Sequence, residues 1–221
     1  DFSKPFKGLS YYRLRKHYHG QLCDGITEYN KRFLEKVPMG KALQQKKIEK
    51  ALGAMKLKVA NKLLPKGLGA LNYTRVFTEL VGLFNEARAE KEMATSLANF
   101  MVLPEYLGLS GDQIAFLNWD SASGTYPALY DLFDYNFKYF ESFENPDAEK
   151  LLHDLEVNRY YPSIQGFLDE NDLDYNKYMK YYMLFRFTSE MLLLLKKQLV
   201  QPENNLKVYL WMEFLTLFKQ N

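Results

Sequence analysis

Two of the chain's three histidines and its only cysteine lie within one short stretch, "RLRKHYHGQLCDG" at residues 13–25. If this stretch is helical, His19 and Cys23 are four residues apart and share a face, a spacing at which they can bind Zn²⁺ together. A structural zinc site usually has four nitrogen or sulfur ligands, and a single cysteine with so few histidines does not complete that set. We therefore expect no metal and no other cofactor, and His19 and Cys23 are the only metal-site candidates that we retain.

The same stretch contains an arginine that is followed, after five intervening residues, by a histidine: Arg13 and His19. This spacing resembles the motif of the HEPN ribonucleases, an all-α family. The resemblance covers seven residues, and Leu14 stands where the family tends to place a polar residue. It implies that His19 would act on the attacking ribose 2′-hydroxyl and that Arg13 would stabilise the phosphate charge.

Other catalytic motifs do not occur in the sequence. Gly40 and Lys41 form a Gly-Lys pair, but Glu35 and Ala42 stand where a phosphate-binding P-loop requires Gly and Ser or Thr. The nucleophile-elbow pattern G-x-S-x-G does not occur either. We assign no catalytic residue, and the sequence favours a protein that is not an enzyme.

The strongest functional signal is the lysine-rich segment 41–66. An apolar stripe with helical spacing predicts an amphipathic helix here, and most of the lysines lie off that stripe. Such a helix can bind an acidic protein surface, nucleic acid or an anionic membrane, although the stripe lacks the Trp and Phe typical of membrane insertion. The alternative without a binding role is a surface helix packed on the protein's own core. The candidate partner-binding residues are Lys46, Lys47, Lys50, Lys58 and Lys62.

Charge is distributed unevenly along the chain, although the formal net charge is only +2. The basic part, residues 1–75, holds 17 Lys and Arg against 5 Asp and Glu, whereas the acidic part, residues 76–221, holds 12 against 22. This asymmetry suggests a basic surface for an acidic partner. The alternative is that the two parts neutralise each other in the fold.

Helical periodicity dominates the sequence and predicts an all-α single domain, residues 1–221, with seven to nine helices in bundle-like or orthogonal packing. The apolar run at 191–195 is much shorter than the roughly 20 residues that a transmembrane helix needs. No strand alternation is convincing. The helices are expected at 8–36, 41–64, 72–103, 110–119, 128–143, from 145 onward, 174–200 and 206–218, with 120–127 and 160–166 irregular.

We therefore expect a non-catalytic interaction protein, an accessory or adaptor subunit of a larger protein complex. Two binding alternatives remain: a nucleic-acid-binding protein that uses residues 11–66, and an immunity-type inhibitor of a single partner protein. A third alternative, from a different class, is a helical enzyme that uses His17, His19 or His153. The nearly all-apolar segment 206–218 is expected to be buried, either in this core or against another chain. One cysteine allows no intrachain disulfide and fits a reducing compartment, either the cytoplasm or an organelle matrix reached after processing.

Overall fold

A computed structural model describes residues 11–60, 68–99, 102, 106–110, 113–116, 123–197 and 202–220. These residues form a mostly helical single domain with nine helices and a small three-stranded antiparallel sheet, which confirms the predicted fold class. A separate two-stranded hairpin lies beside α1.

The first part of the chain supplies four helices and two strands. The chain leaves α1 through a short strand, and α3 and α4 then precede the second strand. In order, the elements are α1 (Tyr11–Arg32), β1 (Glu35–Pro38), α2 (Met39–Ala42), α3 (Gln45–Ala60), α4 (Leu68–Arg88) and β2 (Glu92–Ala98).

The second part begins with strands and ends with five helices. Its first two strands form the hairpin, and its third joins β2. In order, the elements are β3 (Leu107–Ser110), β4 (Gln113–Phe116), β5 (Ser123–Pro127), α5 (Tyr130–Glu141), α6 (Ala148–Arg159), α7 (Pro162–Asn171), α8 (Tyr175–Lys197) and α9 (Pro202–Gln220).

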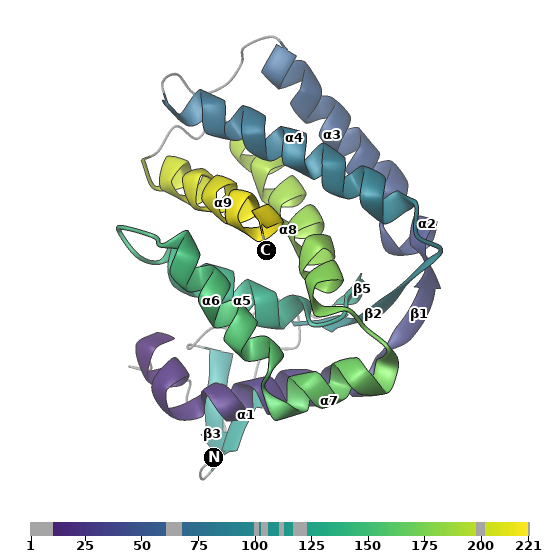
Figure 1. The fold of residues 1–221 in the computed structure, drawn as a ribbon, viewed down its shortest axis with the longest axis vertical. Coiled ribbons are helices and arrows are strands. Elements are labelled where there is room, and N and C mark those ends of the chain that lie inside the picture. The colour runs from purple at the N-terminus through teal and green to yellow at the C-terminus, as the bar shows by residue number, and fades with distance from the viewer. Residues whose placement is uncertain are drawn as a thin grey trace.

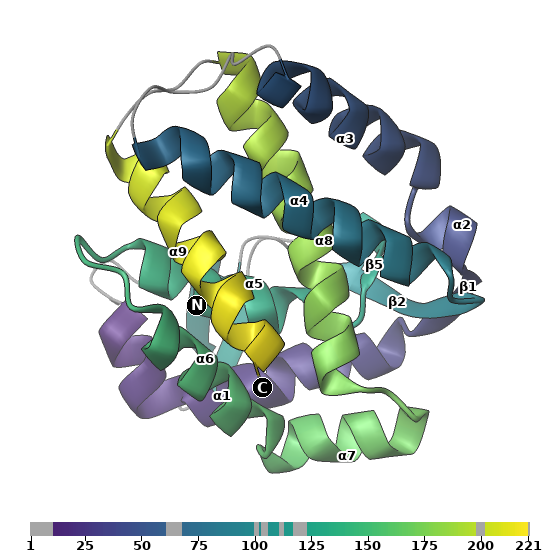
Figure 2. The same ribbon diagram turned by 45° about the horizontal axis from the view of Figure 1, so that its top comes forward.

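Helix α8 runs through the middle of the molecule (Figure 1). It contacts α3 and α4 on one side and α5 on another, while α9 contacts α4 and α6. Helix α1 lies at the opposite end of the molecule from α3, beside α7 (Figure 2). The basic segment of the sequence therefore forms an outer helix of the domain and not its centre.

Aromatic side chains fill the core between α5, α8 and α9. Trp211 stacks on Phe187 with ring centroids 4.4 Å apart, and Phe137 contacts Phe214 edge to face at 4.9 Å. All four are fully buried, and burying such side chains is among the largest stabilising contributions in a domain. Helix α9 is anchored through this cluster, but it exposes Leu206 and Tyr209. It is therefore buried on one face within this core, and burial of its other face against another chain stays a prediction.

Three buried polar side chains tie the sheet region to the helices. The Asn30 side chain accepts a hydrogen bond from the backbone N–H of Leu129 at 2.9 Å. Leu129 has a positive φ of 62°. Asp131 accepts from the Tyr29 hydroxyl and from the backbone N–H of Asn99, both at 2.6 Å. Because buried polar groups need partners, these bonds fix where α1, β2 and α5 meet.

Several predicted boundaries were wrong where tertiary pairing decides the structure. Of the helix expected at 110–119, the described residues Ser110 and Gln113–Phe116 lie instead in the hairpin, where Ser110 pairs with Gln113. Strand β5 occupies much of the expected loop at 120–127 and pairs with β2. The first predicted helix, 8–36, ends earlier than expected, because Glu35 and Lys36 belong to β1, which pairs with β2. Strand β2 in turn occupies residues 92–98 of the helix predicted at 72–103.

The expected irregular segment 160–166 also proved to be largely helical. Helix α7 begins at Pro162, and proline is favourable in the first turn because its missing N–H has no helical partner there. The helix predicted from 145 onward is confirmed as α6. Its N-cap is Asp147, two residues after the predicted start, whose side chain accepts a hydrogen bond from the backbone N–H of Lys150.

Candidate functional site

Within the histidine–cysteine stretch, Arg15 and His19 lie on the face of α1 that contacts α5 and α6. Arg15 donates from Nη2 to Asp154 Oδ2 at 2.5 Å and from Nη1 to Asn136 Oδ1 at 3.3 Å. One turn later, His19 Nε2 lies 2.6 Å from Asn158 Oδ1. The equal spacing of both pairs, four residues on each helix, aligns the two helices side by side.

Burial keeps His19 and Cys23 in their neutral forms. The pKa of His19 is lowered, mainly because burial removes water from the imidazolium, and the hydrogen bond to Asn158 only partly opposes this effect. Burial raises the pKa of the Cys23 thiol to about 12. The Cys23 sulfur lies 3.7 Å from His19 Nε2 and is fully buried. A protonated, inaccessible thiol is neither a nucleophile nor a ready metal ligand.

The structure does not bring a metal-ligand set to the two candidates. Within the part of the chain that the structure describes, no three His, Cys, Asp or Glu side chains are placed to hold an ion. His19 Nε2 is already engaged by the Asn158 amide oxygen. We interpret His19 and Cys23 as part of the contact between α1 and α6.

Arg13 and His19 do not converge as a ribonuclease pair would require. They lie on one uninterrupted helix, where six residues correspond to a separation of about 120° around the axis. Arg13 is exposed, whereas His19 is half-buried against α6. The arginine on the histidine's own face is Arg15, and Asp154 neutralises it.

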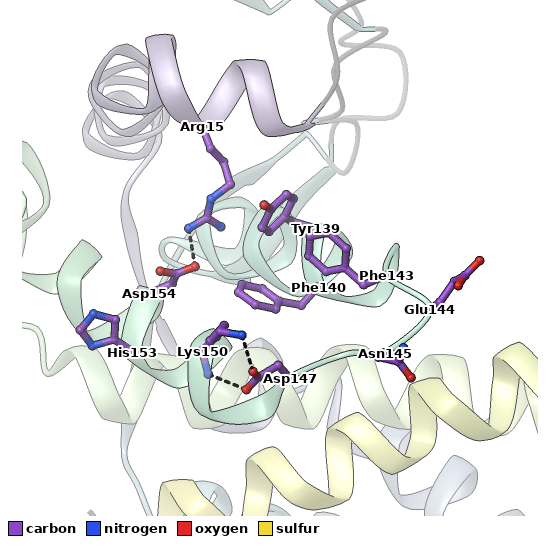
Figure 3. A pocket seen from close by; sticks show the side chains of 10 residues that line it. All are labelled: Arg15, Tyr139, Phe140, Phe143, Glu144, Asn145, Asp147, Lys150, His153 and Asp154. Atoms are coloured by element: carbon purple, nitrogen blue, oxygen red, sulfur yellow. Dashed lines mark hydrogen bonds and ion pairs between the residues drawn. The ribbon is translucent and has the colours of Figure 1, made fainter.

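A depression of about 840 Å³ opens where Arg15 meets α5 and α6 (Figure 3). Its aromatic wall includes Tyr139, over which the Arg15 guanidinium lies at 4.4 Å from the ring centroid. Its cations are paired: Arg15 with Asp154, and Lys150 with Asp147 at 2.9 Å. The depression is therefore nearly balanced in charge, and the described residues that line it include no serine, threonine or cysteine.

The predicted partner-binding lysines lie mainly on α3. Lys46, Lys47 and Lys50 are exposed and Lys58 is half-buried, while Lys62 lies outside the described residues. Ile48, Leu52 and Met55 are buried, which confirms the predicted apolar stripe; Leu63 on that stripe is not described. Helix α3 packs by this stripe on α4 and α8, and its lysines face outward.

These lysines are not neutralised inside the molecule. Lys46, Lys47, Lys50 and Lys58 form no ion pair with any described carboxylate. By contrast, Lys177 pairs with Glu90 and Lys180 with Glu86 on the other side of α4. Carboxylates of the acidic part therefore pair with lysines of the same part, and these four α3 lysines have no ion pair with a described carboxylate.

Sequence reasoning missed a buried cluster of charges between α5, α8 and α9. Arg186 has a side chain that is only 3% exposed and forms ion pairs with Asp134, Glu141 and Glu190 at 2.7–3.0 Å. Trp211 Nε1 also donates to Glu141, at 2.7 Å. The one sequence signal is the four-residue spacing of Arg186 and Glu190. The partners on α5 lie about 50 residues away, and no local pattern reveals them.

No protein-family model, curated protein or solved structure matches this chain. In the described part of the chain, no helix combines the length and apolarity needed to cross a membrane. The function must therefore be argued from the chain's own residues, and the α3 lysines are the site that the geometry favours.

Proposed function

We propose that this protein is a non-catalytic interaction protein that binds an acidic protein surface through the basic face of α3. One observation carries the proposal: Lys46, Lys47 and Lys50 are exposed side by side on an outer helix with no ion pair to the described carboxylates. Uncompensated charge of one sign steers association with a partner of opposite charge. An accessory or adaptor subunit of a larger complex is the role that fits such a surface.

Charge reversal of α3 tests the proposal. The variant Lys46→Glu/Lys47→Glu/Lys50→Glu is compared with the wild type in the source lysate, by size separation and mass spectrometry of co-migrating proteins. A partner found with the wild type is then purified and its affinity for each protein is measured. We expect the triple variant to lose the partner, because attraction becomes repulsion, while its helical content stays the same.

A matched control changes the same number of exposed lysines elsewhere. Lys16 on α1, Lys36 on β1 and Lys91 before β2 are exposed, and reversing them changes the net charge equally. This control should keep the partner. If the α3 variant binds the partner as tightly as the control does, the proposal is wrong.

The same experiment separates the two binding alternatives. A complex that nuclease treatment dissolves identifies nucleic acid as the partner, and its affinity then falls steeply with salt because phosphate contacts release counterions. A tight one-to-one pair with a single protein identifies an inhibitor. Tyr11, one of the aromatic residues interleaved with the basic ones near the N-terminus, packs on Tyr135 and Tyr139, so its ring contributes to packing within the domain.

A further inference from the structure

Beside the α3 lysines lies an apolar groove of about 340 Å³ between α3 and α8, which we call the α3–α8 groove. One wall comes from α3 and the other from α8, and Leu43 and Tyr126 also line it. Its volume is enough for one or two large side chains of another molecule, which is how anchor residues bind at protein interfaces.

Both walls repeat with helical spacing. The α3 wall is formed by Lys47, Ile48, Lys50, Ala51 and Ala54, and the α8 wall by Phe185, Thr188, Ser189 and Leu192. The two alanines and the serine are small, so the groove stays open between two straight helices. Over residues 47–54 such a wall is roughly 11 Å long, or about two turns of a partner helix.

The charge around the groove has one sign. Lys47 and Lys50 are the only charged side chains among the described residues that line it, and neither has an ion pair there. The Lys47 ammonium donates a hydrogen bond to the Gln44 side-chain oxygen at 3.3 Å. An occupant with carboxylates beside its apolar side chains would complement both the apolar lining and the positive charge of this surface.

We propose that the α3–α8 groove binds an acidic amphipathic helix of a partner protein, whose apolar side chains fill the groove and whose Asp or Glu side chains pair with Lys47 and Lys50. This inference rests on the proposed function, because it specifies what the basic face of α3 recognises. Helix-in-groove binding uses anchors at i, i+3, i+4 and i+7, the same spacing that both walls show.

Other occupants fit the groove less well. Both walls are helices, and among the described residues β5 contributes only Tyr126 to the lining, so an extended peptide in the groove would lie between two helices. Nucleic acid would gain from the lysines but not from the apolar floor, because its phosphates need cations and its bases need exposed aromatic faces. The one aromatic pair lining the groove, Tyr126 and Phe185, packs ring against ring with centroids 5.7 Å apart.

The test uses a defined probe, a fluorescein-labelled peptide of about 18 residues, long enough to be helical, with Leu and Phe anchors on one face and Glu on the others. A scrambled peptide of the same composition and a charge-swapped peptide with Lys for Glu are the controls. Binding is measured by fluorescence anisotropy at low and high salt. We expect the wild type to bind the acidic amphipathic peptide at least about tenfold more tightly than either control.

Two substitutions fill the groove from opposite walls. Ala54→Trp and Ser189→Trp should each weaken binding of the acidic peptide by about tenfold or more, since the new ring occupies the space of the anchor. Thr78→Trp, at an exposed position on α4, is the matched control and should bind as the wild type does. Ser189 is exposed, so its variant remains informative if Ala54→Trp fails to fold.

Charge reversal tests the role of the two lysines that line the groove. The double variant Lys47→Glu/Lys50→Glu should lose the acidic peptide and gain affinity for the charge-swapped one. The inference is overturned if the scrambled peptide binds equally well, if no peptide binds, or if both tryptophan variants bind like Thr78→Trp. Should the tryptophan variants retain a partner that the triple lysine reversal loses, the proposed function stands and only the groove is wrong.

Discussion

Arg186 shows how much one side chain can determine at the residue scale. Its guanidinium is buried, yet every neighbouring carboxylate that it pairs with has a further partner: Lys138 pairs with Asp134, and Lys207 with Glu141 and Glu190. Burial alone would disfavour its charge, but the surrounding carboxylates outweigh this effect, and the pKa of Arg186 is raised. A buried cluster that is balanced in charge holds α5, α8 and α9 in one arrangement.

Replacing Arg186 with Met should destabilise the protein strongly. The substitution leaves Asp134 and Glu141 buried without their main partner, and removing one member of a buried ion pair costs about 3–5 kcal/mol. Denaturant unfolding followed by circular dichroism measures the change. As a control, Lys180→Met breaks an exposed pair with Glu86, for which a loss of about 0–1 kcal/mol is expected. Equal losses in the two variants would contradict this interpretation of the cluster.

His19 should make the stability depend on pH in a specific direction. Its pKa in the folded protein is lowered by burial, while the unfolded chain has the ordinary value of about 6.5. As the pH falls below about 6.5, the unfolded state takes up the proton first, so the free energy of unfolding decreases. Unfolding measured at two pH values on either side of 6.5 should show this loss.

The variant His19→Gln isolates the contribution of this histidine. A glutamine amide can still donate to Asn158 but does not titrate, so the loss of stability at low pH should shrink. The wild type, measured at the same two pH values, provides the comparison. An unchanged pH dependence in His19→Gln would show that its burial does not control protonation.

At the scale of elements, two glycines on helices should respond in opposite ways to alanine. Gly53 is exposed in the middle of α3, and an added Cβ would have no neighbour within 4 Å. Gly53→Ala should stabilise the protein by about 0.5–1 kcal/mol, because alanine loses less backbone entropy on forming a helix. At Gly25 of α1, a Cβ would lie 2.6 Å from the Phe116 ring, so Gly25→Ala should destabilise. Thermal unfolding of the two variants tests both signs.

Element types were predictable from the sequence wherever an element buries one continuous stripe. Helices were predicted at the positions of α3, α6 and α8. The signals were the apolar stripe of α3, the acidic residues at the start of α6 and the long apolar sequence of α8. The strands were not predictable because they are short and depend on distant partners: β2 pairs with β1 and β5, more than 50 and about 30 residues away. The candidate lysines were identifiable from composition, but the α3–α8 groove was not, since residues near 50 and 190 meet only in the fold.

At the scale of the whole molecule, the basic and acidic parts do not form separate units. Helix α1 packs on α5 and α7, α3 packs on α8, and α4 packs on α8 and α9, so one hydrophobic core includes residues from both parts. Unfolding should therefore occur in one cooperative transition. Far-ultraviolet circular dichroism and tryptophan fluorescence should give coincident curves. Two separated transitions would contradict a shared core.

The position of β1 at the edge of the sheet affects how copies of this protein behave at high concentration. An uncovered strand edge can pair with the same edge of another molecule and start aggregation. Strand β1 is only four residues long, exposes Glu35 and Lys36, and ends at Pro38, which has no N–H to donate. Each of these features discourages edge-to-edge pairing. This edge of the sheet thus brings little of the aggregation risk that an open strand brings.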